Sequence, residues 1–143
     1  MKADEKTREE VLAVLDRLNE GYAAGDLEGM AALYTTDPDL VAIGTGKDEK
    51  FLGLEAVREG LERDFAQSES VAIEVDWSSV SARGDVAWLA AETTARVKAA
   101  GGEMTIPARL TMVLEKRDGR WLIAQFHLSM AMPEQAAGES FPG

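Results

Sequence analysis

The stretch from Met104 to Met130, MTIPARLTMVLEKRDGRWLIAQFHLSM, decides the fold. Two runs of alternating residues, Met104 to Glu115 and Trp121 to Met130, flank the turn sequence Asp118-Gly119. This pattern predicts a β-hairpin. Pro107 has no backbone N–H to donate, so it predicts a bulge or a locally unpaired position that bends the sheet. The stretch therefore supplies the last two strands of an antiparallel sheet.

The period of two extends upstream of this hairpin. Val71, Ile73, Val75 and Trp77 alternate with polar or small residues, and a long strand is expected from Val86 to about Lys98. Arg83-Gly84-Asp85 and Ala100-Gly101-Gly102 are turn sequences at the two ends of that strand. Long strands joined by successive turns predict an antiparallel meander.

Helical spacing precedes the strands. Thr7-Arg8-Glu9-Glu10 reads as a capping box with Thr7 as N-cap, and Gly25 ends the helix that follows. Asp26 caps a short second helix that extends through Tyr34 and ends at Asp37-Pro38. The first third of the chain is thus expected to be mainly helical.

A short strand from Leu40 to Ile43, a loop from Gly44 to Glu49 and a third helix from about Leu54 to Gln67 complete the pattern. Helices first and strands last predict an α+β fold, with the helices covering one face of the sheet. We expect a single domain over residues 1–143, with a core from about 7 to 132 and a tail from 133 to 143.

Composition narrows the function. The chain has 45% hydrophobic and 29% charged residues, which is typical of a globular protein, and it shows no signal peptide or membrane span, so a cytoplasmic location is expected. It has no cysteine and a single histidine, His127, so thiolate and multi-histidine metal sites are excluded and we expect no cofactor. A net charge of −11 makes nucleic acid and anionic membranes poor partners.

Several short motifs, in this order and spacing, resemble the SnoaL-like branch of the nuclear transport factor 2-like superfamily over about residues 7 to 132. They are Ala24-Gly25-Asp26, Leu33-Tyr34, Asp37-Pro38-Asp39, Ile43-Gly44-Thr45-Gly46, Gly53-x-Glu55-Ala56-Val57, Asp118-Gly119-Arg120-Trp121-x-Ile123 and His127-x-Ser129. The resemblance implies a cone, in which a strongly bent sheet wraps a long helix around a pocket. It also implies a homodimer packed through the outer sheet face. Activities in the superfamily range from isomerases, cyclases, dehydratases and hydrolases to pure binding modules, so the fold does not give the function.

Strand parity predicts which side chains face the pocket. In the strand from Met104 the even-numbered residues are all apolar, and in the last strand the apolar set is Leu122, Ala124, Phe126, Leu128 and Met130. An apolar face belongs against the helices. We therefore expect the ligand pocket to be lined by Tyr34, Leu89, Ala91, Thr93, Leu110, Met112, Phe126 and Leu128. Tyr34 and Thr93 would be its polar points.

The opposite parity predicts the outer face. His127 is the one imidazole and could serve as a general base near neutral pH, but parity favours an outer-face position at a dimer interface. Gln125 and Arg109 share that face. We therefore predict that Arg109, Gln125 and His127 belong to the dimer interface.

Two comparisons within the resemblance argue against known chemistries. The arginines that bind carboxylates in the association domain of calcium/calmodulin-dependent protein kinase fall here near Thr93 and on Met112 and Leu128. The base and tyrosine positions of ketosteroid isomerase fall on Gly44 and Leu18. None of these residues can perform the corresponding task.

Three carboxylates remain as weak catalytic candidates. Asp48 and Glu49 are adjacent in the Gly44–Glu49 loop, where they could act in acid–base chemistry or hold a divalent cation, and Asp76 lies in a strand. The leading hypothesis is a homodimeric binder of a small hydrophobic molecule. The alternatives are a cyclase, isomerase or hydrolase that uses one of these carboxylates, or a non-catalytic dimerisation scaffold.

Overall fold

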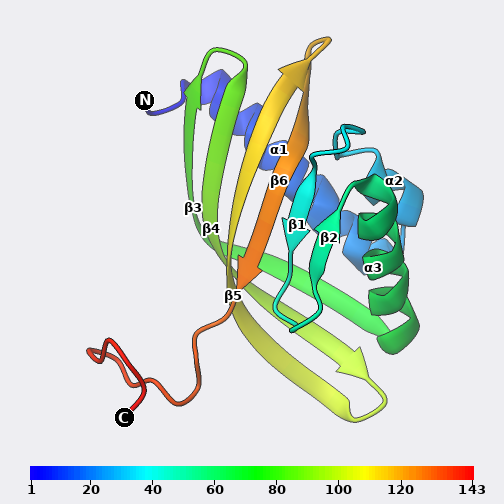
Figure 1. The fold of residues 1–143 in the computed structure, drawn as a ribbon, viewed down its shortest axis with the longest axis vertical. Helices are drawn as coiled ribbons and strands as arrows, with labels where there is room; N and C mark the ends of the chain where they lie inside the picture. The colour runs from blue at the N-terminus through cyan, green and yellow to red at the C-terminus, as the bar shows by residue number, and fades with distance from the viewer.

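A curved six-stranded sheet, in the order β2-β1-β6-β5-β4-β3, carries three helices on one face (Figure 1). The computed structural model describes residues 1–143. All strand pairs are antiparallel except β1 with β6. The elements are α1 (Glu5–Ala24), α2 (Leu27–Ala31), β1 (Val41–Ile43), β2 (Lys50–Leu52), α3 (Leu54–Gln67), β3 (Ser70–Arg83), β4 (Val86–Ala99), β5 (Gly102–Arg117) and β6 (Arg120–Ser129). This arrangement confirms the predicted α+β class and the expected bent sheet with its helices on one face.

The first helix begins earlier than its capping box predicts. Asp4 is the N-cap of α1, and its Oδ1 accepts a hydrogen bond from the Thr7 backbone N–H at 2.8 Å. The expectation that Thr7 caps the helix was therefore wrong. Aspartate is a stronger N-cap than threonine, which explains the choice. Gly25 ends α1 in the left-handed conformation, with φ 64°, as expected.

The second helix is shorter than expected because the chain after it pairs with the sheet. The Thr35 N–H donates to the Ile123 carbonyl at 2.9 Å, and the Ile123 N–H donates to the Leu33 carbonyl at 2.8 Å. These bonds hold Tyr34 in a parallel bridge beside β6. Asp26 caps α2 as predicted, through a hydrogen bond from the Gly29 N–H. The helix from Leu54 to Gln67 has the predicted bounds.

Two β-bulges change the parity on which the sequence prediction relied. In β3 the register shifts between Val75 and Trp77, so Asp76 is the extra residue and Trp77 turns to the outer face, where it is 52% exposed. In β6 the register shifts at Ala124, so Trp121 and Ile123 are buried rather than facing out. A bulge adds one residue to one strand and thereby reverses the faces beyond it.

Pro107 does not mark a bulge, because β4 and β5 pair without a shift through Thr94 and Pro107. The position is locally unpaired on its other side, since the pairing of β5 with β6 ends at Arg109 and Ser129.

The bend of β3, β4 and β5 divides the sheet into two halves (Figure 1). The half nearer the β3–β4 turn packs against α1 and forms the core, in which Leu15, Leu89 and Met112 are almost fully buried. The half nearer the β4–β5 turn leans away from α1 towards α3. Side chains of this second half, among them Val97 and Ile106, line the cavity described below.

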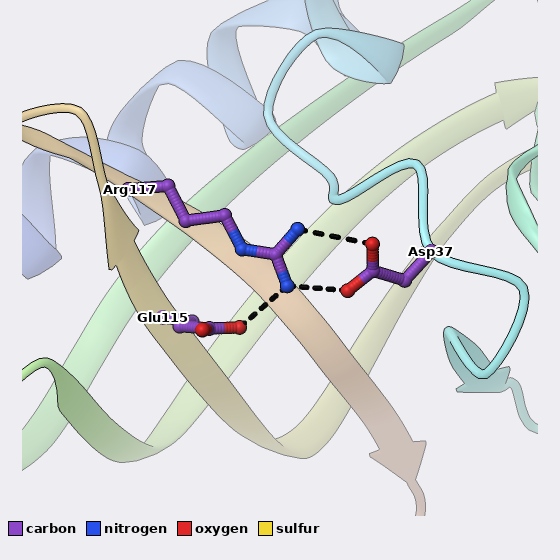
Figure 2. Close-up of polar contacts among 3 residues, drawn as sticks. All are labelled: Asp37, Glu115 and Arg117. Carbon is purple, nitrogen blue, oxygen red and sulfur yellow. Dashed lines mark hydrogen bonds and ion pairs between the residues drawn. The ribbon is translucent and has the colours of Figure 1, made fainter.

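An ion-pair cluster of Asp37, Glu115 and Arg117 connects the loop after α2 to the end of β5 (Figure 2). Both terminal nitrogens of Arg117 bind the Asp37 carboxylate, and Arg117 Nη2 also lies 2.6 Å from Glu115 Oε2. The Arg117 guanidinium lowers the pKa of Asp37 below its usual value. The pair holds the chain between Tyr34 and β1 in place.

Candidate functional site

The space between the sheet and the helices is a cavity of about 320 Å³. The apolar wall comes from the bent half of the sheet and the polar residues come mainly from α1, α3 and the β1–β2 loop. The lining residues are Leu18, Asn19, Tyr22, Thr45, Glu49, Asp64, Gln67, Ser68, Val71, Ile73, Thr93, Ala95, Val97, Ile106, Ala108, Leu110, Phe126, Leu128 and Met130. Twelve of these 19 residues are hydrophobic, so the cavity is suited to a mainly apolar molecule.

A tyrosine and an aspartate form the polar centre of the cavity. The Tyr22 hydroxyl, on α1, donates a hydrogen bond of 3.0 Å to Asp64 Oδ2, on α3. The Tyr22 ring also packs edge-to-face on Phe65, with 5.9 Å between ring centroids. Burial raises the pKa of Asp64, and the nearby Glu49 carboxylate raises it further, whereas the Tyr22 hydroxyl and Arg63 lower it. The Asp64 carboxyl is therefore a group whose proton is held more tightly than usual.

A smaller inner chamber of about 80 Å³ adjoins the main cavity. The two spaces share Tyr22, Glu49, Asp64, Phe126 and Leu128. Tyr34 lines the inner chamber and is 6% exposed, and its burial raises the pKa of its hydroxyl. The polar centre thus lies where the two spaces meet.

The chain matches the SnoaL-like domain family over residues 11–133. It belongs to the SnoaL-like family.

Solved structures extend this result. A Xanthomonas campestris protein provisionally assigned as a calcium/calmodulin-dependent protein kinase II association domain is 32% identical, with 93% of this chain and 95% of that chain covered and a TM-score of 0.78. A nuclear transport factor 2-like superfamily protein from Salmonella enterica is 16% identical, with 97% and 100% covered and a TM-score of 0.84. A provisionally assigned dehydratase from Streptomyces avermitilis is also 16% identical, with 90% and 99% covered and a TM-score of 0.82. The search of curated proteins gave no match.

The SnoaL-like domain brings together only part of the predicted pocket. Thr93, Leu110, Phe126 and Leu128 line the main cavity, and Tyr34 lines the inner chamber. The three remaining residues, Leu89, Ala91 and Met112, line neither space and lie in the packed core. Parity placed them on the correct face of the sheet. However, parity does not tell where along that face the sheet leaves α1.

The three predicted catalytic carboxylates likewise divide into residues that line the cavity and residues that do not. Asp48 is exposed and binds Arg63, with 2.7 Å between Oδ2 and Nη1. Asp76 is exposed on the outer face at the β3 bulge, where Thr94 Oγ1 donates to it at 2.6 Å. Glu49 alone of the three lines the cavity. No group of three or more acidic, histidine or cysteine side chains is placed to hold a metal ion.

The residues predicted for the dimer interface lie on the outer face of the sheet. Arg109 pairs in register with Glu92, His127 with Thr111, and Gln125 with Val113. Arg109, Gln125 and His127 are all exposed.

No helix of the SnoaL-like domain is both long and apolar enough to span a membrane.

Sequence reasoning missed Tyr22 and Asp64 as site residues. Tyr22 follows Leu18 by four residues and so continues the apolar stripe of α1, which gives its hydroxyl no separate signal, and Asp64 was not singled out. A signal was present, because Asp64 follows the buried Leu61 by three residues and Val57 by seven, which places it on the inward face of α3. A carboxylate on the buried face of an amphipathic helix is a candidate functional residue.

Proposed function

We propose that this SnoaL-like domain binds a small, mainly apolar molecule in the main cavity, with its polar group towards Tyr22 and Asp64. The observation that carries the proposal is a mainly apolar cavity that contains the hydrogen-bonded pair Tyr22 and Asp64. Its volume of about 320 Å³ is close to the lower end of the range for small-molecule pockets. The superfamily includes both ligand-binding and enzymatic members, which is consistent with this use of the fold.

A fluorescence titration tests the proposal. N-phenyl-1-naphthylamine is apolar and neutral at neutral pH, and its emission rises when it leaves water. We expect saturable binding that Ala95→Trp, on the cavity wall, weakens at least about tenfold by filling the space. Ala72→Trp is the matched control, since Ala72 lies on the neighbouring strand and is exposed on the outer face. Absence of binding, or equal loss in both variants, would refute the proposal.

A second candidate function is proton transfer on the bound molecule by Asp64. The specific observation is a carboxyl inside the cavity whose pKa is raised towards neutrality and whose oxygen accepts a hydrogen bond from Tyr22. A base whose pKa lies closer to the working pH transfers protons more effectively. Two solved relatives of the fold are provisionally assigned as dehydratases.

Carboxyl-detected NMR titration tests this second candidate. Asp64 should titrate above its ordinary value of 3.8. Tyr22→Phe should raise the pKa of Asp64 further, because the hydroxyl hydrogen bond favours the charged form. Titration of Asp64 at or below its ordinary value would remove the reason for assigning it this role.

For the outer face we propose a contact between two copies of the chain. Trp77 is 52% exposed there and pairs in register with Glu92 on β4, which in turn pairs with the exposed Arg109 on β5, so the three residues form one row across the outer face. A large exposed aromatic side chain is typical of an interface. Sedimentation velocity should show a dimer that the double variant Arg109→Glu, His127→Asp converts to a monomer. A wild-type monomer would refute this contact. A dimer that binds no probe would instead favour the scaffold alternative.

A further inference from the structure

Two acidic side chains line the cavity, and no basic side chain lines it with them. Asp64 and Glu49 both line the cavity, and no lysine, arginine or histidine lines either the main cavity or the inner chamber. Arg63 is the basic residue that interacts with both carboxylates. It lies outside both spaces, where it binds Asp48 at 2.7 Å and Glu49 Oε1 at 3.5 Å. Arg63 thus offsets part of the acidic charge from outside the cavity, and no basic side chain does so from inside it.

The β1–β2 loop holds the Glu49 carboxylate in this position. A Cβ atom on Gly44 would lie 1.9 Å from Glu49 Oε2, and a Cβ atom on Gly46 would lie 2.7 Å from Glu49 Oε1. The two glycines therefore leave the space that the carboxylate occupies. The backbone closes around it, because the Gly44 N–H donates to the Glu49 carbonyl at 2.9 Å and the Glu49 N–H donates to the Gly46 carbonyl at 3.1 Å.

An unpartnered hydroxyl on the sheet wall points to a ligand independently of these acidic groups. Thr93 is 5% exposed and lines the main cavity, and its side chain forms no hydrogen bond within the chain. Every side-chain oxygen or nitrogen that is completely inaccessible to solvent has a hydrogen-bond partner. Because the Thr93 hydroxyl has no such partner, it is not completely inaccessible, and it must face the cavity space. A nearly buried hydroxyl without a protein partner is satisfied by water or by a polar atom of a bound molecule, so Thr93 can bind a polar group of a ligand in the cavity.

We infer that the cavity selects an apolar molecule that carries a protonated amine, with Asp64 and Glu49 as its counter-charges and Thr93 as a further hydrogen-bonding group. The inference rests on the proposed function and names its ligand class. Two carboxylates that share a partly desolvated site repel each other, and one ammonium group between them offsets both charges. A carboxylate or phosphate ligand would add a third negative charge, and the net charge of −11 also favours the approach of a cation.

A matched ligand series tests the inference. 1-Naphthylmethylamine, 1-naphthylmethanol and 1-naphthylacetic acid share a ring system and are respectively cationic, neutral and anionic at neutral pH. Isothermal titration calorimetry should show the amine binding at least about tenfold more tightly than the alcohol, and the acid more weakly than either. Asp64→Asn and Glu49→Gln should each reduce the preference for the amine about tenfold and leave alcohol binding nearly unchanged. Asp76→Asn, on the outer face, should change neither the preference for the amine nor the binding of the alcohol.

The outcomes separate the inference from the proposed function. If the alcohol binds and the amine binds no better, the inference fails and the binding function stands. If neither the naphthalene series nor the neutral naphthylamine probe binds, the proposed function itself fails. If Asp64→Asn and Glu49→Gln lose amine and alcohol binding equally, although circular dichroism shows both variants folded, the carboxylates act on the fold of the cavity and the inference also fails.

Discussion

Gly60→Ala should weaken both the packing of α3 and the geometry of the polar centre. Gly60 is buried in α3, four residues before Asp64, and faces the ring of Phe51 on β2. A Cβ atom at position 60 would lie 2.7 Å from Phe51 Cζ and 2.8 Å from Phe51 Cε1, closer than carbon atoms can approach. The aromatic ring is rigid, so either it or the helix must move. A shift of α3 would disturb the 3.0 Å hydrogen bond between Tyr22 and Asp64.

Two opposing terms determine the size of the effect. Alanine is favoured over glycine inside a helix by about 1 kcal/mol. Overpacking of a filled site costs about 1–3 kcal/mol. We therefore expect Gly60→Ala to lower the free energy of unfolding by about 0–2 kcal/mol. In a Phe51→Leu background the clashing ring atoms are absent, so the same substitution should instead stabilise the chain by up to about 1 kcal/mol.

Urea unfolding followed by tryptophan fluorescence measures all four chains of this double-mutant cycle. The expected coupling energy between positions 51 and 60 is about 1–3 kcal/mol. The probe titration should show weaker binding for Gly60→Ala alone than for the double variant. If Gly60→Ala changes the free energy of unfolding by the same amount in both backgrounds, the contact with Phe51 does not set its cost and the reasoning is wrong.

Three further predictions concern charges and the loop. Asp64→Asn should raise stability at neutral pH, and the gain should vanish as the pH falls below 3.8, which thermal melts across pH will show. Gly44→Ala should displace the Glu49 carboxylate and reduce the preference for 1-naphthylmethylamine over 1-naphthylmethanol, as measured by calorimetry, with little loss of stability because the clash involves the mobile end of a side chain. Arg117→Met should return the pKa of Asp37 to its ordinary value in an NMR titration and remove the part of the stability that depends on that ion pair.

The two aspartates shift in opposite directions, so their effects on stability have opposite signs. The folded chain raises the pKa of Asp64 through burial and through Glu49, and the counteracting groups are Tyr22 and Arg63. Ionisation of Asp64 therefore costs stability as the pH rises through its folded pKa. The folded chain lowers the pKa of Asp37, so that stability is present above its unfolded value of 3.8 and is lost as the pH falls through the folded pKa.

Matched controls separate local from general effects. Gly101→Ala has open space around its Cβ atom and a backbone that alanine adopts, so it should leave the ligand preference unchanged where Gly44→Ala reduces it. Asp76→Asn removes an exposed charge on the outer face and should not reproduce the pH-dependent gain of Asp64→Asn. If either control matched its partner variant, the corresponding prediction would be contradicted.

Local signals predicted the elements of this fold well. The bounds of α3 follow from a stripe of apolar residues at helical spacing that begins after Gly53, and the meander follows from turn sequences between alternating runs. The three-residue strand β2 was not predicted, since so short a run has no readable period. The end of α2 was misplaced because a tertiary contact, the bridge from Tyr34 to Ile123, replaces a helical turn.

The candidate site could be predicted only in part, because its position depends on where the sheet bends. Strand alternation correctly separated Thr93 and Leu110 from the outer face, yet it gave Leu89 and Met112 the same status as the cavity residues. The alternation of side chains along a strand shows which face each residue lies on, but it does not show where the sheet bends. The bulge in β3, which lies at the bend, has no strong sequence signal, since Asp76 between Val75 and Trp77 is compatible with a regular strand.

That bulge also relates the core to the cavity. The register of β3 on β4 shifts between Thr93 and Glu92, next to the point where the inner face passes from the core residue Ala91 to the cavity residue Thr93. An extra residue bends its strand and increases the local twist, so the sheet leaves α1 at this place. The sheet then contributes a wall of aliphatic and other apolar side chains with one hydroxyl, whereas the helices and the β1–β2 loop contribute Tyr22, Asp64 and Glu49. Substitutions on α1, α3 and the loop can therefore change the chemistry of the cavity without changing the sheet that creates its space.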